Sequence, residues 1–576
     1  KDDVEAVGLV KFDFLGLRNL TILDWAVRWV CEGYEDRRDF RLEDLPLDDP
    51  AVYRLFSEGN TTAVFQSESR SAKDLEKKLK PDNFEDIIAL MALNRPGPLG
   101  SGMVDDFIAR KKEQSQTGVG KSEWYFHKNL ENTLRPTYGV IVYQEQVMLV
   151  AQLLAGYSLG GADLLRRAMG KKKPEEMAKQ REIFTTGATE RGVDPGLAKQ
   201  LFDLMEKFAE YGFNKSHSAA YALIAYHTGW LKAHYPAEFM AASMSSDMDD
   251  TDKVKVFVED ALTMCQVPGK PKGTRLQMLA PDINQSNFRF TPVKLEGDKV
   301  ASAIRYGLGA VKGTGQAACE AIVAERAANG PFSSLFDFTR RVDRKQINKR
   351  SVEALIRAGA FDLLNPDRAK LLASVGNAMS WAEQQASTAA QVSLFGDDLG
   401  GDVPPDYVEV PAWTDREKLQ QEKAALGYYF SGHLFTADEA KVRQFVRLKL
   451  RELKPGRDLV WMAGVIASLR TMMTKRGKMA IIVLDDSTAQ VELSIFNEQF
   501  EANRNLLRED ELLILQGKVS EDSYTGGLRV TAENLYSLAE ARANFVSRLS
   551  LHMNGQSDAN RLKTLLEPYK DAEKGC

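Results

Sequence analysis

Charged side chains suited to chemistry gather at residues 160–174, GGADLLRRAMGKKKP. The two glycines at the start should break the chain, and Asp163 is predicted to cap a helix with one apolar side. Arg166, Arg167 and Lys171–Lys173 place five cations within eight residues, and these repel one another unless an anion is near. Two interpretations stay open: a solvated basic helix end, or a grip for a triphosphate or nucleic-acid backbone.

A single carboxylate, Asp13, interrupts the apolar segment Val7–Leu15, which is predicted to be a short strand. Lys11 precedes it by two residues and therefore lies on the same face of a strand. Because burying an unpaired carboxylate is costly, Asp13 should either pair with Lys11 or Arg18 or hold a metal ion. The residues alone leave both interpretations open.

The most aromatic part of the chain is Phe208–Tyr235, which holds three of the six histidines. Asn214, Lys215 and His217 lie in a predicted loop, and a helix is predicted to begin at Ser218. An aromatic stripe at helical spacing is usually core. Small polar groups, a cation and free amides at a helix start suit a phosphate or a sugar, so this segment is a candidate ligand site.

Residues 272–365 form a separate basic unit with two glycine turns. In Tyr306–Gly315 the spacing is that of a helix-hairpin-helix, whose backbone amides hold DNA phosphates without reading sequence. A poorer copy follows at Ala354–Leu364, after the cationic run Arg340–Arg350. A glycine turn between packed helices is the alternative, but the doubled hairpin with a basic run favours DNA. The candidate DNA contacts are Lys312, Gly313, Gly315, Arg344, Lys345, Lys349 and Arg350.

Residues 458–538 change to period-two patterning, with five predicted strands and a helix after the third. That order is typical of an OB-fold. Lys475 and Arg476 in its first turn are candidates for contact with a single strand, although the aromatic supply of Trp461, Phe496 and Tyr524 is thin.

Between these units, residues 375–415 lose periodicity and are predicted to be a surface linker. Gln391, Leu394 and Phe395 form a QVSLF pattern there. Exposed apolar residues in a polar tether are typical of a short peptide that docks into a pocket, although so short a pattern also arises by chance. The insert-like Pro268–Arg275, PGKPKGTR, has no assigned role.

The totals exclude several classes of protein. A length of 576 residues predicts about three to five domains. A net charge of −5 excludes a globally basic nucleic-acid binder, so such contacts must be local. Four scattered cysteines argue for reduced thiols and against structural zinc, and no apolar run reaches the roughly 18 residues of a membrane span. The start KDDVEAVG suggests a fragment whose beginning lies upstream.

In order and spacing, these motifs resemble those of the bacterial DNA polymerase III alpha subunits, the replicative C-family polymerases. The resemblance covers essentially the whole chain, and no single motif decides it. It rests on GLVKFDFLGLRNLT, TTAVFQSESR, RPGP, YQEQVM, GGADLLRRAMGKKKPEEM, FAEYGFNKSHSAAYAL, LKAHYPAEFMAA, the hairpin unit, the pentapeptide and TKRGKMAIIVLDD.

The resemblance implies roles for single residues. Asp13 would be the third of three palm carboxylates that hold two Mg²⁺ ions for nucleotidyl transfer. Lys11, Arg166 and Arg167 would contact the triphosphate of the dNTP. His217, with its neighbours Asn214 and Lys215, would lie where the fingers close over the nucleotide.

The resemblance also implies partners. Gln391, Leu394 and Phe395 match an internal sliding-clamp motif, the hairpins would hold duplex primer-template DNA, and the OB-fold would lie near the single-stranded template. The clamp-loader tau subunit and a proofreading exonuclease subunit are further expected partners. The expected location is cytoplasmic, without a membrane contact.

The predicted fold class is multidomain and mainly α, with a C-terminal all-β OB-fold and a short remnant of an α/β palm. The expected domains are the end of the palm (1–34), the fingers (35–271), tandem helix-hairpin-helices (272–374), a linker with the clamp motif at 391–395 and a helical segment (375–455), the OB-fold (456–545) and the start of a tau-binding domain (546–576).

The chain departs from the family pattern in its carboxylates. The other two of the three palm carboxylates, an Asp-x-Asp pair, would lie upstream of Lys1. One carboxylate cannot hold two metals, so this fragment is expected to be inactive alone and the intact subunit active. Two competing hypotheses remain. One is a non-catalytic DNA- and clamp-binding replisome module, and the other is a repair or recombination protein, which leaves Asp13 and Gly160–Pro174 without a role.

Overall fold

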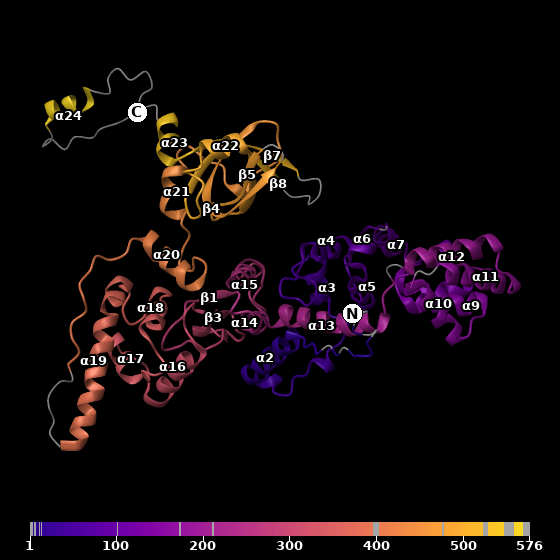
Figure 1. Ribbon diagram of the computed structural model, residues 1–576, viewed down its shortest axis with the longest axis horizontal. Coiled ribbons are helices and arrows are strands. Elements are labelled where there is room, and N and C mark those ends of the chain that lie inside the picture. The colour runs from indigo at the N-terminus through magenta and orange to yellow at the C-terminus, as the bar shows by residue number, and fades with distance from the viewer. Residues whose placement is uncertain are drawn as a thin grey trace. The chain divides into compact units, whose positions relative to one another are not determined.

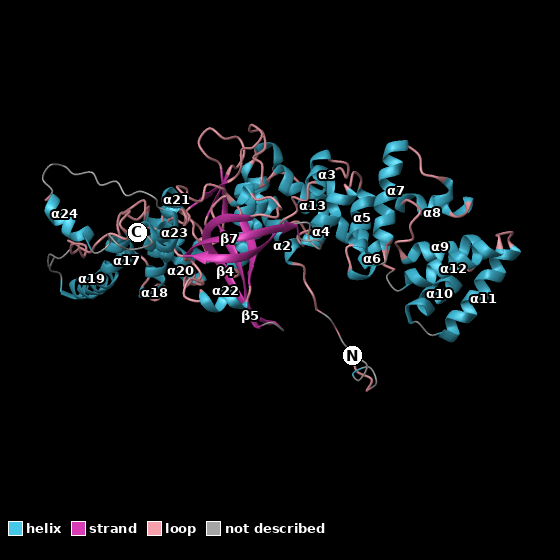
Figure 2. Cartoon of the chain, turned by 90° about the horizontal axis from the view of Figure 1, so that it is seen from above, coloured by secondary structure: helices cyan, strands magenta, loops and turns pink. Residues whose placement is uncertain are grey.

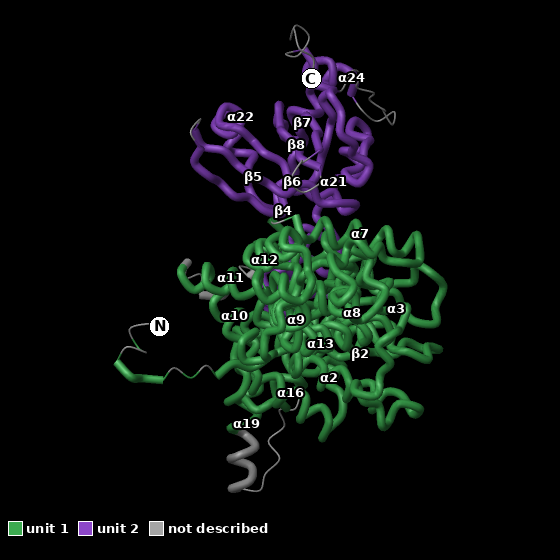
Figure 3. The backbone as a smooth tube through the Cα atoms, turned by 90° about the vertical axis from the view of Figure 1, so that its right-hand side faces the viewer, with its two compact units in different colours: residues 1–366, 374–406 green, residues 367–373, 407–576 purple. Residues whose placement is uncertain are grey.

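The structure is a computed structural model. It describes residues 4, 7–10, 12, 14–100, 102–171, 174–209, 212–395, 403–474, 477–521, 528–545 and 558–567, without the side chains of 170, 171, 174, 208, 209 and 388–395. The chain forms two compact units (Figure 3): residues 1–366 with 374–406, and residues 367–373 with 407–576. Each unit is described by itself.

The first unit is helical over most of its length (Figure 1). Its helices up to residue 263 are α2 (Arg18–Gly33), α3 (Pro50–Ser57), α4 (Arg70–Leu79), α5 (Phe84–Leu93), α6 (Pro96–Gly100), α7 (Met103–Thr117), α8 (Glu131–Leu134), α9 (Gln144–Ala155), α10 (Leu159–Lys171), α11 (Pro174–Glu190), α12 (Pro195–Ala209), α13 (Lys215–His234), α14 (Pro236–Ser246) and α15 (Thr251–Thr263). The predicted mainly helical character of this region is confirmed. Across the described residues, none of these helices combines the length and apolar character needed to cross a bilayer.

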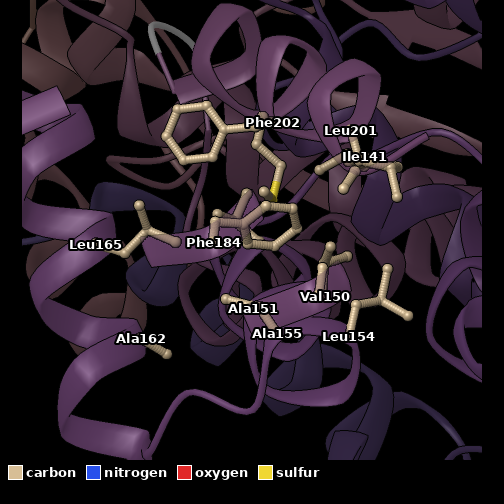
Figure 4. Close-up of a cluster of buried hydrophobic side chains, with 14 of the residues drawn as sticks. Ile141, Val150, Ala151, Leu154, Ala155, Ala162, Leu165, Phe184, Leu201 and Phe202 are labelled. Atoms are coloured by element: carbon tan, nitrogen blue, oxygen red, sulfur yellow. The ribbon is translucent and has the colours of Figure 1, made fainter. Parts of the chain in front are cut away.

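Helices α9 to α12 enclose a core of their own. Figure 4 shows Phe184 of α11 and Phe202 of α12 facing the apolar sides of α9 and α10. Leu165 and Ala162 of α10 are fully buried in this core. Because one side of α10 is fixed there, its opposite side, which carries the two arginines, has a defined direction.

Helix α13 is the central element of the neighbouring layer, and it packs against α3, α5 and α14. Gly229 allows the close approach to α3, since a Cβ at this position would lie 3.1 Å from Cε2 of Phe56. Its N-cap is Asn214, whose side-chain oxygen accepts a hydrogen bond from the His217 backbone N–H at 2.7 Å. The helix therefore begins at Lys215, three residues before the predicted start at Ser218, because the cap lies further upstream.

Helix α10 also begins earlier than predicted. The Ser158 hydroxyl accepts a hydrogen bond from the Gly161 N–H at 3.1 Å, so the glycines lie inside the first helical turn and Asp163 is not the cap. A helical glycine costs about 1 kcal/mol. Burial of Ala162 and Leu165 offsets that cost here.

The basic unit after residue 272 combines a small sheet with helices. Strand β3 (Ala303–Arg305) pairs in parallel with β1 (Gln277–Leu279) and antiparallel with β2 (Thr291–Val293). The 3₁₀ turn η6 (Leu308–Ala310) follows, and then α16 (Gln316–Asn329), α17 (Leu335–Arg341), α18 (Lys349–Arg357) and α19 (Arg368–Phe395).

The linker predicted from residue 375 is wrong for its first part, because α19 continues to Phe395. The Ala, Gln and Glu that suppress apolar periodicity are strong helix formers. Ala378 and Ala382 are buried, and Trp381 lies edge-on to Phe336 of α17 with ring centroids 5.9 Å apart.

The strand predicted at Val7–Leu15 is also not formed by its described residues, which adopt turn and irregular conformations. A strand needs a neighbour to complete its ladder of hydrogen bonds, and no described strand pairs with this segment. Phe14 and Leu15 are 94% and 93% exposed, so the apolar pattern has no partner surface within the described residues.

The second unit contains a closed five-stranded barrel, the group of magenta strands in Figure 2, in the order β4-β5-β6-β8-β7. Its elements are β4 (Leu459–Thr474), β5 (Gly477–Asp485), β6 (Gln490–Ile495), α22 (Asn497–Ala502), β7 (Leu512–Glu521) and β8 (Leu528–Tyr536). The helix follows the third strand, so the predicted OB-fold is confirmed. Outside the barrel this unit has α20 (Asp415–Leu426), α21 (Thr436–Val442), α23 (Leu538–Phe545) and α24 (Ala559–Leu566).

Candidate nucleic-acid interface

The starts of α9 and α13, about 70 residues apart in the sequence, are joined directly. Tyr143 and Phe213 form a parallel β-bridge, and the Gln144 N–H donates to the Phe213 carbonyl at 2.9 Å. The Gln144 side chain also donates to the carbonyl of Gly212 at 2.9 Å. This contact, which we call the finger junction, sets two helix N-termini side by side.

Glu145 holds the predicted ligand residues of α13 in place. One carboxylate oxygen accepts from Asn214 Nδ2 at 2.7 Å, and the other accepts from the Lys215 N–H at 2.9 Å. The Lys215 ammonium lies 2.9 Å from Glu85 of α5 and over the Tyr143 ring. Carboxylates therefore fix both residues before any ligand arrives.

Helix α10 brings Arg166 to the same junction. Asp163 Oδ1 accepts from Arg166 Nε and Nη2 at 3.0 and 2.8 Å, and Nη1 reaches Gln144 Oε1 at 3.3 Å. Arg167 pairs with the other Asp163 oxygen at 2.8 Å, but its side chain is 63% exposed against 33% for Arg166. Hydrogen bonds from Arg166, together with the charge of Arg167, hold the pKa of Asp163 below its usual range.

His217 lies one turn into α13 and is exposed. Its ring lies tilted by 30° against the Tyr221 ring at 4.2 Å between centroids and meets the Phe213 ring edge-on at 5.1 Å. The Arg95 guanidinium lies over the Phe213 ring, 3.7 Å from its centroid. The junction thus combines cations with aromatic faces, which suits a phosphate group attached to a planar base.

The first hairpin of the basic unit is tightly built. Gly313 has φ of +93°, a left-handed conformation that favours glycine, and the Thr314 hydroxyl donates to the Leu308 carbonyl at 2.7 Å. Gly315 then precedes α16. Lys312, Gly313 and Gly315 are exposed, so their backbone can approach a phosphate.

The two hairpin copies lie against each other. A Cβ at Gly313 would lie 3.9 Å from Nε of Arg350 and 3.8 Å from the Cβ of Ala354, both on α18. Lys349 and Arg350 open α18 and are exposed, and Arg350, the last residue of the basic run, lies next to the turn of the first hairpin. The remaining candidates, Arg344 and Lys345, are exposed as well, and Arg344 pairs with Glu383 at 3.0 Å.

In the OB-fold barrel, one of the aromatic residues expected to contact a single strand, Trp461, packs against other residues of the protein. Trp461 packs on Tyr536 and Phe545 with centroids 5.2 and 4.6 Å apart, so it belongs to the contact with α23 and is not a free platform. Phe496 is 48% exposed, as are Met472 at 48% and Met473 at 79% on the long strand β4. Of these three side chains, only the Phe496 ring offers an aromatic face on which a base could stack.

Comparison with known protein families gives a separate match for each of these three regions of the chain. The family model of the bacterial DNA polymerase III alpha subunit finger domain matches residues 19–192, that of the helix-hairpin-helix motif residues 275–371, and that of the OB-fold nucleic acid binding domain residues 460–538. The DNA polymerase III subunit alpha of Pseudomonas aeruginosa is 48% identical over 600 residues, covering 100% of this chain and 50% of the relative.

The chain belongs to the bacterial DNA polymerase III alpha subunit family. The subunits from Neisseria meningitidis serogroup A (48% identical) and Escherichia coli O157:H7 (44%) each align with 99% of the chain, covering 48% and 49% of their own lengths. The chain therefore spans about half the length of these curated relatives. A solved asparaginyl-tRNA synthetase from Pyrococcus horikoshii matches 20% of the chain and 26% of its own, 23% identical, with a TM-score of 0.14, which is too low to show a shared fold.

Several predicted site residues of this family member lie outside the described residues. They are Lys11, Asp13, Lys475 and Arg476. Gln391, Leu394 and Phe395 lie at the C-terminal end of α19, and their side chains are outside the description too. Among the described residues, no group of three or more His, Cys, Asp or Glu side chains could hold a metal ion.

Sequence reasoning missed the residues that connect the site. Gln144 and Glu145 lie in the YQEQVM motif and Arg95 in the RPGP motif, but the sequence assigned none of them to the finger junction. The available signal was local: polar side chains at a helix start need partners, and here the partners come from a second helix start. Tyr221 carried no such signal, because its position on the His217 ring appears only when α13 is helical from Lys215 onward.

Proposed function

We propose that the chain supplies the nucleotide- and DNA-holding parts of a DNA-directed DNA polymerase. The reaction is transfer of a nucleotidyl group from a dNTP to the primer 3′-hydroxyl, with release of pyrophosphate. The finger junction carries this proposal, because Arg166, Lys215 and His217 come from two helices to one place in a chain whose relatives are named DNA polymerase III subunit alpha.

The junction would act by positioning charge. A triphosphate carries several negative charges, and forked guanidiniums and ammonium groups bind it best when they need not reorganise. Asp163 and Glu85 already hold Arg166 and Lys215 in fixed rotamers. The cations are thus in place before the nucleotide binds, and they can stabilise charge that moves onto the leaving phosphates.

Magnesium belongs to the same proposal. Mg²⁺ prefers oxygen ligands and would lower the cost of forming the attacking alkoxide and the pyrophosphate. Asp13 is the one carboxylate of this chain that the family resemblance assigns to it.

The hairpins would hold the product duplex, and the barrel would lie near the single-stranded template. Support for the hairpins comes from the exposed turn Lys312–Gly315 and the adjoining Arg350 of α18. Backbone amides and flexible cations of this kind contact phosphates and not base edges.

A sliding clamp is the proposed partner of the end of α19. Deleting Leu394 and Phe395 from the full-length protein should abolish clamp-stimulated primer extension and leave clamp-free extension intact. Retained stimulation would refute the docking role. The tau subunit and a proofreading exonuclease are further proposed partners, which co-purification with the full-length protein tests.

The decisive experiment uses Arg166→Ala with Arg167→Ala in the full-length protein. Loss of two charged contacts, each worth about 1.5–3 kcal/mol, should raise the KM for dNTPs on the order of 100-fold. The matched control is Arg181→Ala, which removes an arginine of α11 that is also paired with carboxylates, Asp203 and Glu206.

An unchanged KM in the double variant would place the phosphate grip elsewhere. If the full-length wild-type protein binds primer-template DNA but incorporates no nucleotide, the non-catalytic module is the correct alternative.

A further inference from the structure

A second concave region of the first unit lies apart from the finger junction. It is a pocket of about 730 Å³ between α3, the end of α13 and the loop at residues 264–275. No residue of the junction lines it. The loop contains PGKPKGTR, the segment to which the sequence alone assigned no role, so the pocket gives that segment a place in the fold.

The loop at residues 264–275 forms one wall of the pocket, and its own hydrogen bonds hold it in shape. The Val267 N–H donates to the Thr274 carbonyl at 2.9 Å, and the Gly273 N–H donates to Gln266 Oε1 at 2.7 Å. Gly269 and Gly273 have φ of +72° and +96°, so the two turns rely on glycine. The loop folds back on itself, and the hydrogen bonds within it fix the backbone that carries its two lysines.

The charge on the pocket wall is positive. Its cations are Arg54, Lys232, Lys270, Lys272 and Arg275, and the one carboxylate among its lining residues is Glu58. Two of these cations form ion pairs with carboxylates that do not line the pocket, Lys232 with Asp260 at 2.7 Å and Lys270 with Asp298. That leaves three cations against one carboxylate.

The remaining cations differ in how firmly they are held. The Arg275 guanidinium donates to the Thr263 carbonyl at 2.7 Å and to Gln266 Oε1 at 3.0 Å. Arg54 and Lys272 are exposed, and within the described part of the chain neither forms an ion pair. Glu58 accepts from Asn60 Nδ2 at 2.8 Å, so its charge is partly satisfied. The wall therefore has one anchored cation and two that are available to an anion.

The pocket also has an apolar part. Ala51 and Leu55 of α3 and Met264, Val267 and Pro268 of the loop region all line it. A volume of a few hundred cubic ångströms with apolar walls and a few charged groups is typical of a small-ligand site. The combination matches a ligand with a planar apolar part and a negatively charged part.

We propose that this pocket binds a nucleoside polyphosphate, at a site separate from the finger junction and beyond the activity proposed above. The phosphates contact Arg54, Lys272 and Arg275, and the base lies against the apolar wall formed by Leu55 and Pro268. The pocket gives the fingers a second nucleotide site in which no bond is made or broken.

The test is photo-crosslinking of the 576-residue chain with 8-azido-dATP, followed by peptide mapping, together with equilibrium dialysis of labelled dATP. Dialysis is performed in the Arg166→Ala, Arg167→Ala background, which removes the junction contacts. Label on peptides from residues 51–60 or 264–275 supports the proposal, and its absence from both overturns it.

Charge reversal supplies the second criterion. Arg54→Glu with Lys272→Glu should weaken dATP binding at the pocket by at least about tenfold, because two charge-assisted contacts become repulsive. Arg54→Lys with Lys272→Arg should retain binding, which separates a charge effect from misfolding. Lys255→Glu changes an exposed lysine on α15 that does not line the pocket, and it should have no effect. Equal weakening by both charge reversals overturns the proposal.

Competition identifies the ligand chemistry. Displacement by dATP at lower concentration than by inorganic tripolyphosphate supports recognition of base and phosphate together. Equal displacement by both means a simple anion site and overturns the base contact. Displacement by single-stranded oligothymidylate at lower phosphate concentration than by dATP assigns the phosphates to a DNA strand and overturns the free-nucleotide proposal.

Discussion

Two cationic regions of the first unit, the finger junction and the doubled hairpin, differ in how far their cations are paired with carboxylates. At the junction, Arg166 and Arg167 are bonded to Asp163, and Lys215 is bonded to Glu85. At the hairpins, Arg344 and Lys349 pair with Glu383 and Glu353. Lys312 and Arg350 are exposed and form no ion pair among the residues that the structure describes.

The difference follows from what each region would hold. A cation bonded to a carboxylate has already lost its rotamer freedom, so it binds a small ligand in one geometry at low entropic cost. An unpaired lysine or arginine stays mobile and can follow a duplex whose phosphates move past it. Pairing therefore distinguishes a positioning site from a sliding surface, and the distinction can be tested by mutation.

The largest effect is expected at the carboxylate that organises the junction. Glu145→Ala removes the acceptor of both Asn214 Nδ2 and the Lys215 N–H. Two charge-assisted bonds of about 1.5–3 kcal/mol each are lost, so the KM for dNTPs in the full-length protein should rise on the order of 100-fold in steady-state assays.

The control for this prediction is Glu131→Ala. Glu131 lies on α8 and pairs with the exposed Arg135 at 2.8 Å. Exposed helix pairs contribute little, so the KM should change by less than about twofold. A similar rise of the KM in both variants would show that Glu145 does not organise the finger junction for nucleotide binding.

A smaller effect, of a different kind, is expected at the hairpins. Lys312→Ala with Arg350→Ala should make the negative slope of log K against log salt shallower by about 1.8, where K is the association constant for duplex DNA. Each lost phosphate contact removes about 0.9 from the magnitude of that slope. Fluorescence anisotropy of a labelled duplex measures it, and the KM for dNTPs should not change. Arg344→Ala serves as the comparison, because Glu383 already engages that arginine at 3.0 Å. A flat salt response of the wild-type chain would contradict the phosphate contacts.

The smallest effect is expected from Asp163→Asn. The amide keeps the size of the side chain but loses the charge that orients Arg166 and Arg167, so the KM for dNTPs should rise only a few-fold. The pKa of Asp163 is lowered by its arginine partners, so its pairing is fully present above the unfolded pKa of about 4 and is lost only as pH falls through the lower folded value. The ratio of wild-type to variant KM should therefore be constant from about pH 6 to about pH 9. A ratio that changes in this range would show that another group orients the arginines.

The parts predicted best from the sequence were those governed by local pattern. Alternation with a helix after the third strand determines the barrel of Leu459–Tyr536, and glycine spacing determines the hairpin at Gly313. The errors came where composition hid a pattern: the alanines of α19 looked like a linker, and the glycines of α10 looked like a break although Ser158 caps the helix before them. The apolar run at Val7–Leu15 predicted a strand, but pairing is not a local property.

The sequence by itself determined which cations exist, most of the helices and strands, and the family to which the order of the motifs belongs. Only the tertiary structure decided which cations are already paired, and that Glu145 joins the starts of α9 and α13, which lie about 70 residues apart. The physical reason is range: propensity, capping and periodicity act within a few residues, whereas a carboxylate finds its partner through the packing of whole helices.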